Sequence, residues 1–420
     1  MLDKYPRRVA ITGYGAVCSL GNDVDEIWNA IINYKVGYKS VKYNDSNIVS
    51  RFFGKMEDKP SMKERGFSKS ITKFLPEFAK LGMYAASEAV NMAFNQEGEL
   101  EDTYTPFERG VIFGTGWGSL DEATVEIKNF HDMGMASPFS NLIVMPNVAT
   151  AAMSMHWNLR GYQNTPIAAC ATGSIAIGDA FEIIRSGRAK MMIAGGGESI
   201  REDFCVWSID ALRALSKEQE ALEKACCPFS QDRSGFVLSE GAAVLCLEDM
   251  DSAQERGARI LGEITGYGNY SDARDITSPA EDLLARKETI STAINRAGLA
   301  PEDIDYINTH GTSTPLNDLN ETQALKLALG NHAYKVPMSS TKSYTGHLVG
   351  GAGSIESIFC LKTIETGIMP ATIHLNNPDP ECDLDFIPNV HKQKDDIQRI
   401  MNVNYGFGGS NSALLFESPN

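Results

Sequence analysis

The chain has 420 residues, a length that predicts either one large two-lobed body or two fused units. Its apolar fraction of 43% and charged fraction of 22% are ordinary for a globular protein. The formal net charge of −16 argues against a general nucleic-acid binder, which would need a basic face, but not against an acidic protein partner, which a local basic patch could bind.

The first apolar run, Val9–Gly15, is short and contains glycines, so it predicts a strand and not a signal peptide. No run approaches the ~18 apolar residues that a membrane helix needs, and we expect a cytoplasmic protein without a membrane span. The eight cysteines include no Cys-x-x-Cys pair. A zinc site or a disulfide framework is therefore not expected, and most of the cysteines should be buried, inert thiols.

Short patterns recur in the same order along the chain. Ile11–Gly15 (Ile-Thr-Gly-Tyr-Gly) returns as Ile264–Gly268, and each copy predicts a strand that enters a turn. Val111–Thr115 is matched by Tyr306–Thr312, since both are β-rich runs that end in Gly-Thr.

The third recurrence is helical. A Gly-Ser-Ile sequence at Gly173 starts a segment that ends at Gly187, and the same sequence at Gly353 starts one that ends at Gly367. Apolar residues follow at helical spacing in both segments, and each final glycine suits a helix C-cap.

Together the matches predict a tandem duplication, with an N-terminal half at 1–255 and a C-terminal half at 256–420. The alternative is chance recurrence of glycine-rich turns. Strands such as Ala243–Leu247 alternate with helices, which favours an α/β fold with buried mixed sheets. Two such halves would form a five-layer α/β/α/β/α body, and the insertions near 40–110 and 120–165 should carry loops or an interface.

Cys170 follows the run Thr165–Ala169 and precedes the helix expected from Gly173. The sequence therefore predicts a strand-to-helix turn of the nucleophile-elbow kind, in which the side chain is presented rather than buried. The start of a helix also favours the thiolate, which is the nucleophilic form. The alternative is a cysteine that serves packing alone.

Histidines and a lysine stand at other element ends. His310 follows a predicted strand, although a lone histidine is more often a satisfied core or surface group. Lys342 and His347 lie five residues apart, before a glycine-rich helix start. Because that helix repeats the one after Cys170, a pseudo-twofold would bring Cys170 and His347 together.

The last pattern, Asn404–Ser410, is a glycine-rich loop that can adopt positive φ and direct N–H groups into a cavity, or is a plain hairpin turn. One cysteine, two histidines and a lysine at element ends suit acyl transfer from a thioester. A cysteine protease is less natural, because no papain- or caspase-like signature surrounds Cys170.

These motifs resemble those of the β-ketoacyl-acyl carrier protein synthases, the Cys-His-His condensing enzymes of the thiolase superfamily. The resemblance spans about residues 8–417 and rests on Ala169–Gly173, His310–Thr314, Ser340–His347 and Gly406–Gly409. It implies a thiolase fold and an acyltransferase that condenses an acyl thioester with malonyl-acyl carrier protein, in ping-pong order through an acyl-cysteine. It implies no cofactor, since the phosphopantetheine arm of acyl carrier protein carries the substrates.

By this resemblance, Cys170 takes the acyl group, and neutral His310 and His347 donate hydrogen bonds to the enolate oxygen. The N–H groups of Cys170 and Phe407 would form the oxyanion hole, and the Phe407 side chain would gate the extender unit. Lys342 would position His347 and a water molecule electrostatically.

The resemblance also implies binding positions. Thr312 and Thr314 would hydrogen-bond the pantetheine arm, Gly408 would bind substrate, and Arg213 would contact the acidic carrier protein.

Glu356 would be a structural carboxylate beneath the site. A monovalent cation near Asn308, Glu356 and Asn402 is compatible with the family, with structural rather than catalytic weight. Trp117 replaces a small or aliphatic residue of the acyl tunnel, which predicts short or unusual primers. The alternative is that Trp117 packs aside in a dimer interface.

Asn331–Tyr334 and Asp379–Asp385 also resemble ketosynthases of type II polyketide systems, in which the active chain pairs with a homologue lacking the nucleophile. Because Cys170 is present, this chain would be the catalytic member. A homodimer and a heterodimer with a chain-length subunit stay open, as do fatty acid and polyketide biosynthesis. A thiolase acting on coenzyme A esters and a non-enzymatic chain-length subunit are the alternatives, and the two histidines with Lys342 and Cys170 argue against them.

Overall fold

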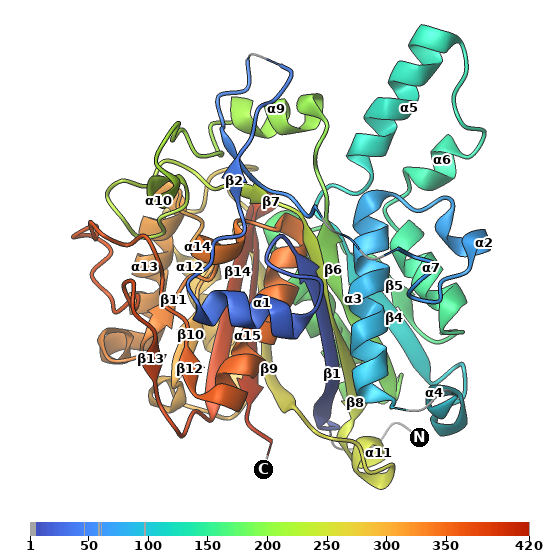
Figure 1. The fold of residues 1–420 in the computed structure, drawn as a ribbon. Coiled ribbons are helices and arrows are strands. Elements are labelled where there is room, and N and C mark those ends of the chain that lie inside the picture. Colours follow the sequence, from blue (N-terminus) through green and yellow to red (C-terminus); the bar gives the residue numbers. More distant parts are fainter. Residues whose placement is uncertain (1–5, 46, 58, 60, 96–97, 420) are drawn as a thin grey trace.

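The computed structural model describes residues 6–45, 47–57, 59, 61–95 and 98–419 (Figure 1). Within them, strands alternate with helices, and a ten-stranded mixed sheet runs through the body in the order β11-β10-β14-β15-β9-β1-β8-β6-β4-β5. The predicted α/β class is confirmed. Its strands are β1 (Val9–Cys18), β4 (Arg109–Gly114), β5 (Gln163–Asn164), β6 (Met191–Glu198), β8 (Gly241–Asp249), β9 (Gly262–Ser271), β10 (Tyr306–Asn308), β11 (Met338–Ser339), β14 (Arg399–Gly406) and β15 (Ser410–Glu417).

The sheet has two five-stranded parts with the same internal arrangement. Reading inward from the edges, β5-β4-β6-β8-β1 matches β11-β10-β14-β15-β9, with two parallel pairings followed by two antiparallel ones in each part. The parts join where Val9–Ile11 of β1 pairs with Gly262–Ile264 of β9. The predicted boundary between residues 255 and 256 falls between α11 (Met250–Glu255) and β9, and the division itself stays a prediction.

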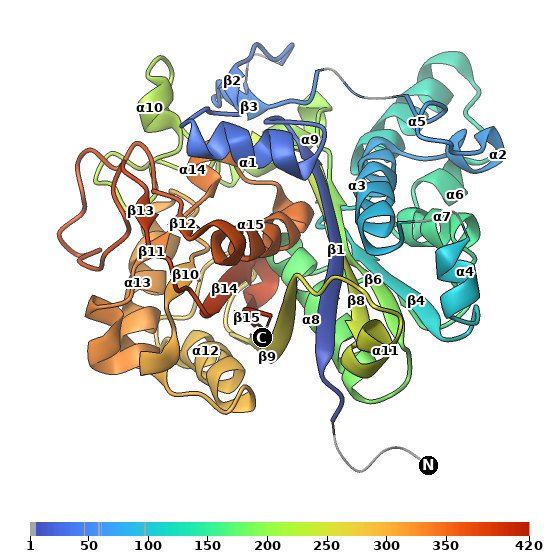
Figure 2. The ribbon, with the colours of Figure 1, turned by 60° about the horizontal axis from the view of Figure 1, so that its bottom comes forward.

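Helices form the other layers (Figure 2). α8 and α15 pack on each other and lie between the two parts of the sheet, while α3 and α7 cover the outer face of the first part. α12 covers the outer face of the second part, with α13 beside it. The bounds are α3 (Glu77–Ala93), α7 (Val148–His156), α8 (Thr172–Arg185), α12 (Leu284–Arg296), α13 (Pro315–Leu329) and α15 (Ala352–Thr366).

The glycines of the first recurring pattern lie inside long strands, so the turns predicted there are wrong. A Cβ at Gly13 would overlap the Ala89 carbonyl oxygen of α3, and a Cβ at Gly268 would overlap the Thr289 carbonyl oxygen of α12. The glycines therefore let one helix in each part lie directly against the strands.

The two central helices cross where each has a glycine. A Cβ at Gly173 would lie 2.7 Å from the backbone nitrogen of Ser354, and a Cβ at Gly353 would overlap Oγ of Ser174. Because the crossing is close and lies near both N-termini, the starts of α8 and α15 meet at one place in the interior.

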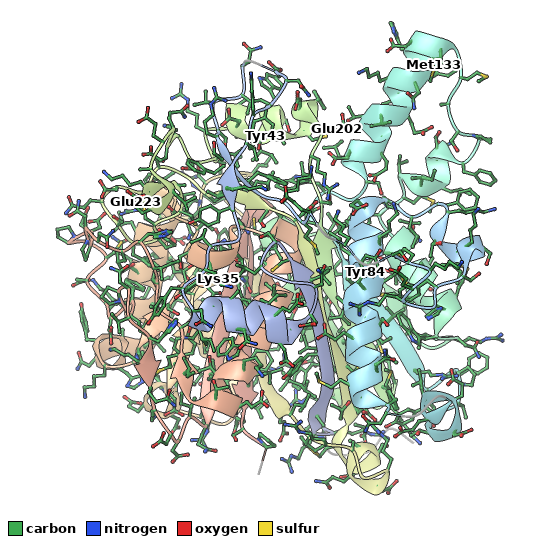
Figure 3. The ribbon with its side chains drawn as sticks, in the orientation of Figure 1. Lys35, Tyr43, Tyr84, Met133, Glu202 and Glu223 are labelled. Carbon is green, nitrogen blue, oxygen red and sulfur yellow. The ribbon has the colours of Figure 1, made fainter. Side chains whose placement is uncertain are left out.

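The first part of the predicted insertion near 120–165, which holds α5 and α6, forms an arm that extends from the body in Figure 1. Met133 lies near the outer end of α5 (Figure 3). None of the residues of α5 is buried, and its exposed apolar side chains are Val125, Ile127, Phe130 and Met133. The helices of this arm are α5 (Leu120–Met133) and α6 (Ser140–Ile143).

The remaining helices and strands lie around this framework. None of the helices in the described ranges combines the length and apolar character that a membrane crossing requires. All eight cysteines are free and buried. The elements are α1 (Val24–Ile32), β2 (Lys39–Ser40), β3 (Phe52–Gly54), α2 (Lys69–Thr72), α4 (Glu99–Thr103), α9 (Asp203–Ala211), α10 (Leu222–Ala225), β7 (Leu238–Ser239), α14 (Lys342–Thr345), β12 (Ile368–Met369) and β13 (Lys392–Gln393).

Candidate active site

Cys170 lies in a 3₁₀ turn, Ala169–Ala171, directly before α8. Strand β5 ends at Asn164, so a loop leads into the cysteine, and the predicted strand-to-helix turn is wrong on this point. Cys170 is only 5% exposed, which also corrects the expectation of a presented side chain. The thiol instead faces an internal cavity.

That cavity has a volume of about 350 Å³ and is lined by both parts of the chain. Cys170 comes from the first part, and His310, His347 and Phe407 come from the second. The exposed side chain of Arg213 also lines it. The arrangement can admit an extended substrate arm to a buried thiol.

Cys170, His310 and His347 meet inside the cavity. One ligand atom from each side chain, the sulfur or a ring nitrogen, lies within 4.8 Å of the other two. The imidazole rings stand edge to face, with centroids 5.5 Å apart. These atoms could in principle hold a metal ion, but the buried ammonium of Lys342 beside His310 makes the place unfavourable for a cation.

Each histidine has one ring nitrogen held by the protein. His347 Nδ1 accepts a hydrogen bond of 3.1 Å from the Val349 N–H, and His310 Nδ1 lies 3.4 Å from Lys342 Nζ. Both arrangements put the ring proton on Nε2, and Nε2 of His347 is buried without a partner. The site thus offers two N–H donors for an oxygen that becomes negative.

The surroundings of both histidines favour the neutral ring. Burial is the main cause that lowers the pKa of His310 and of His347 well below the ordinary value, and the Lys342 charge is the next. Repulsion between the two rings, which we expected to matter, contributes less and only for His310.

Lys342 lies against His310, and its charge also acts on His347 through space, so the electrostatic role that the resemblance implies stays a prediction. Its ammonium donates to Glu356 Oε1 at 2.5 Å, and Asn404 Nδ2 donates to Glu356 Oε2 at 2.6 Å. Burial raises the pKa of Glu356, while the charge of Lys342 opposes this effect. The ion pair fixes the ammonium behind the His310 ring.

The thiol of Cys170 is a weak acid here. Burial raises its pKa to about 12, although Lys342 and the Phe407 N–H, which donates to the thiol, lower it. Desolvation is the main cause of this raised pKa, and the predicted help from the start of α8 stays a prediction. To attack, the thiol must therefore lose its proton as its sulfur bonds to the substrate.

The chain matches known proteins over most of its length. Residues 6–253 match the family described as beta-ketoacyl synthase, N-terminal domain, and residues 261–376 match its C-terminal domain. The chain belongs to the beta-ketoacyl synthase family. The predicted family and its condensing acyltransferase chemistry are thereby confirmed.

Two curated members of the family are 38% identical to this chain, with 98% of each chain covered. They are the 3-oxoacyl-(acyl-carrier-protein) synthase 2 of Synechocystis sp., aligned over 418 residues, and that of Staphylococcus aureus, aligned over 414 residues.

Solved ketosynthases have the same fold. A type II polyketide ketosynthase in complex with its acyl carrier protein and bound to the hexaketide is 30% identical, with a TM-score of 0.89, over 99% of this chain and 100% of that one. The ishigamide ketosynthase/chain length factor is 26% identical, with a TM-score of 0.88 and the same coverage.

The loop at Phe407–Gly409 departs from the expectation in one respect. Phe407 is half-buried and lines the cavity, whereas Gly408 does not. Gly408 has a φ of 81° and donates its N–H to the Ile276 carbonyl at 2.7 Å. It therefore ties two loops together, and direct substrate binding by Gly408 is not supported.

Thr312 and Thr314 line the cavity as expected, with their Oγ1 atoms 2.9 Å apart. Thr314 Oγ1 also accepts from the Asn317 N–H and so caps α13. Its hydroxyl thus already has a structural partner.

Trp117 packs against the hydrophobic cluster that contains Cys170 and Val349. The N–H groups of Gly116 and Trp117 donate to the carboxylate of Glu198, which is fully buried. Burial raises the pKa of Glu198 to about 8. This carboxylate, which the sequence did not single out, fixes the turn that carries the indole.

Two of the three residues at the predicted cation position have side chains that suit a cation. Asn308 and Asn402 are partners in the β10–β14 register, and Oδ1 of each is buried without a hydrogen bond. Orphaned amide oxygens suit a hard cation. Both oxygens of Glu356 are occupied by Lys342 and Asn404, so this carboxylate fits the cation less well.

Sequence analysis missed other residues of the cavity. The Phe236 ring lies 4.9 Å from that of His347, and Arg286 lies above the Tyr405 ring. The glycine-rich loop pointed to the neighbourhood of Tyr405. Arg286 gave no signal, because it is an isolated arginine near the start of an ordinary helix.

Proposed function

We propose that the chain joins an acyl thioester to a malonyl thioester, both carried on acyl carrier protein, with Cys170 as the nucleophile. The observation that carries the proposal is the meeting of the buried thiol with two neutral imidazoles whose Nε2 atoms bear the proton. The curated names of the relatives and the carrier protein in a related complex support the same carrier.

In the first half-reaction, the sulfur of Cys170 attacks the thioester carbonyl as the thiol loses its proton. The N–H groups of Cys170 and Phe407 are suited to hold the oxygen that becomes negative. The carrier thiolate leaves and takes the proton. Because the arm must pass the cavity mouth, Arg213 and the hydroxyls of Thr312 and Thr314 are placed to contact the carrier and its arm.

In the second half-reaction, the malonyl group loses CO2 and its thioester becomes an enolate. His310 and His347 donate to the enolate oxygen, and Lys342 behind His310 stabilises the charge at short range. The enolate carbon attacks the acyl group on Cys170. The sulfur leaves as a thiolate and takes up a proton from water, and the product is two carbons longer.

The test is Cys170→Gln, which removes the nucleophile but keeps a side chain in the cavity. We expect condensation to be lost while malonyl decarboxylation continues, as measured by product mass and by release of CO2. Cys205→Ala, a buried cysteine of the same hydrophobic cluster, is the matched control and should condense normally. Condensation by the Cys170→Gln variant would sink the proposal, and turnover of coenzyme A esters without malonate would favour a thiolase.

We also propose that Trp117 shortens or redirects the acyl tunnel, because the indole packs in the cluster that surrounds Cys170. Trp117→Gly should shift the preferred primers toward longer acyl chains in a competition assay. An unchanged chain-length profile would refute the idea.

The exposed apolar face of α5 supports a partner chain of the same fold. Monomeric proteins rarely expose such a patch, and β5 lies at the sheet edge on the same part of the molecule. The partner is a second copy or a homologous chain-length subunit, as in the ishigamide complex. Native mass spectrometry with and without a co-expressed homologue separates these cases.

For the amides of Asn308 and Asn402, we propose a monovalent cation with a structural role. Potassium should raise the melting temperature relative to a bulky organic cation at equal ionic strength. This difference should vanish in Asn402→Ala.

A further inference from the structure

Arg286 is a buried cation that forms no ion pair with any of the described residues. The residue is only 5% exposed, and its Nε and Nη1 atoms are sealed from solvent without a hydrogen bond. Arg286 lines the same cavity as Cys170 and His310. Because a charge left buried and unpaired is destabilising, this arrangement indicates a ligand that balances it.

The nearest acids do not balance the charge. Asp272, Asp318 and Glu321 all act on Arg286 through space, but within the described part of the chain none forms an ion pair with it. Asp272 accepts from the side chain of Asn411, while Asp318 and Glu321 accept backbone N–H groups. Burial raises the pKa of Glu321 to about 7, which weakens its negative field.

Tyr405 holds the guanidinium in place without satisfying its donors. The guanidinium carbon lies 3.9 Å from the centre of the Tyr405 ring, and that ring lies 5.7 Å from the ring of His310. A ring face attracts a cation but offers no lone pair to its N–H groups. The guanidinium therefore stands one aromatic ring away from the imidazole that receives the enolate.

We propose that Arg286 binds the carboxylate of the malonyl extender unit before decarboxylation, an inference that rests on the proposed function. Three anionic groups would approach the cavity in that reaction. The enolate oxygen belongs to the two histidines, and the phosphodiester of the arm stays near the mouth because it is joined to the carrier protein outside. The carboxylate remains, and a guanidinium is the side chain best shaped to bind one through two N–H groups.

This contact acts on binding and not on chemistry. In the decarboxylation, the bond between the carboxyl carbon and C2 breaks, and its electron pair moves to C2 and the thioester oxygen. CO2 leaves uncharged, so Arg286 holds the ground state more strongly than the products of this step. An acyl primer has no carboxylate, and Arg286 thus distinguishes the two substrates that share one cavity.

The experiment uses the whole chain with malonyl- and acyl-carrier protein, and compares Arg286→Met with Arg286→Lys. For Arg286→Met we expect a KM for malonyl-carrier protein about 10- to 100-fold higher, the effect of losing hydrogen bonds to a charged group, with kcat unchanged or raised. Acyl loading of Cys170, followed by intact mass, should stay within about 2-fold of the natural chain, which also shows that the variant is folded. Arg286→Lys keeps the charge but loses the paired N–H donors of the guanidinium. Its KM for malonyl-carrier protein should lie between those of the natural chain and Arg286→Met.

Lys287→Met removes the neighbouring, half-buried charge of the same helix and should leave every constant unchanged. An unchanged KM for malonyl-carrier protein in Arg286→Met would overturn the inference. Equal losses for the acyl and malonyl substrates would overturn it too, because they would indicate a contact to the shared arm or a structural role. Failure of the natural chain to condense at all would instead count against the proposed function.

Discussion

The starts of α8 and α15 have nearly the same backbone but opposite chemistry. Each helix follows a 3₁₀ turn, and Ala169 and Val349 stand at the same place in these turns with the same φ of 47°. The next residue is Cys170 before α8 and Gly350 before α15. Further along, Glu356 of α15 corresponds to an alanine of α8. One junction supplies the nucleophile, and the other supplies a buried charge.

The difference shows how one local structure can serve two purposes. A Cβ at Gly350 would lie 2.5 Å from the Gly116 nitrogen, so this junction has no room for a side chain where the other carries its thiol. The second junction instead contributes through Glu356, which holds Lys342 against His310. Substitutions at each junction can therefore separate the two roles.

Lys342→Met should destabilise the second junction, at the start of α15. It leaves the Glu356 carboxylate buried with only Asn404 as a partner, and we expect a loss of about 3–5 kcal/mol in the free energy of unfolding. Urea denaturation measures it. The double variant Lys342→Met with Glu356→Gln should recover much of this stability without recovering condensation. Equal stability of the single and double variants would show that the ion pair is not what holds this junction.

Gly350→Ala tests the space at the second junction. The new methyl group meets backbone that Glu198 holds in place, and the cost should be about 1–3 kcal/mol in the free energy of unfolding. The matched change in the first junction is Cys170→Ala, which should cost only about 1 kcal/mol, because it removes one buried atom. If both substitutions cost the same, the two junctions do not differ in packing as described.

The acidity of the thiol gives a prediction about pH. A Cys170 pKa of about 12 means that the thiolate fraction grows about tenfold for each pH unit up to that value. The rate of alkylation of Cys170 by iodoacetamide, followed on its peptide, should therefore keep rising from pH 7 to pH 10. A plateau below pH 8 would mean that the start of α8 stabilises the thiolate after all.

The smallest effect concerns the strained turn. Ala169 has a φ of 47°, which is unfavourable for a residue with a Cβ. Ala169→Gly should stabilise the chain by about 0.5–1 kcal/mol. Ala171→Gly, at an ordinary φ of −90°, should destabilise it by about 0.5–1 kcal/mol. Shifts of the same sign in the two variants would contradict the strain.

Part of this structure could be predicted from the sequence, because recurrence and motif report local backbone needs. The Gly-Ser-Ile starts and terminal glycines located α8 and α15, and motif resemblance pointed to Cys170, His310, Lys342 and His347. The contacts between distant segments could not be predicted this way. The pattern around Gly13 predicted a turn. The glycine is instead required because α3 packs against the strand at Ala89, a residue far away in the sequence.

The contacts of the buried charged residues also could not be predicted from local sequence patterns. Nothing near Lys342 in the sequence tells which histidine it contacts, since that depends on how α14 and β10 pack. The same holds for Arg286, whose burial and missing partner follow from the fold and not from its neighbours in the chain.

The central claim is that the thiol of the first part and the imidazoles of the second act on one thioester. Incubation with an acyl-carrier protein thioester, followed by peptide mass spectrometry, tests it most directly. We predict a single acyl adduct on Cys170 that disappears when malonyl-carrier protein is added. A product two carbons longer, attached to the carrier protein, should appear at the same time. An adduct on another cysteine, or an adduct on Cys170 that malonyl-carrier protein does not discharge, would contradict the account.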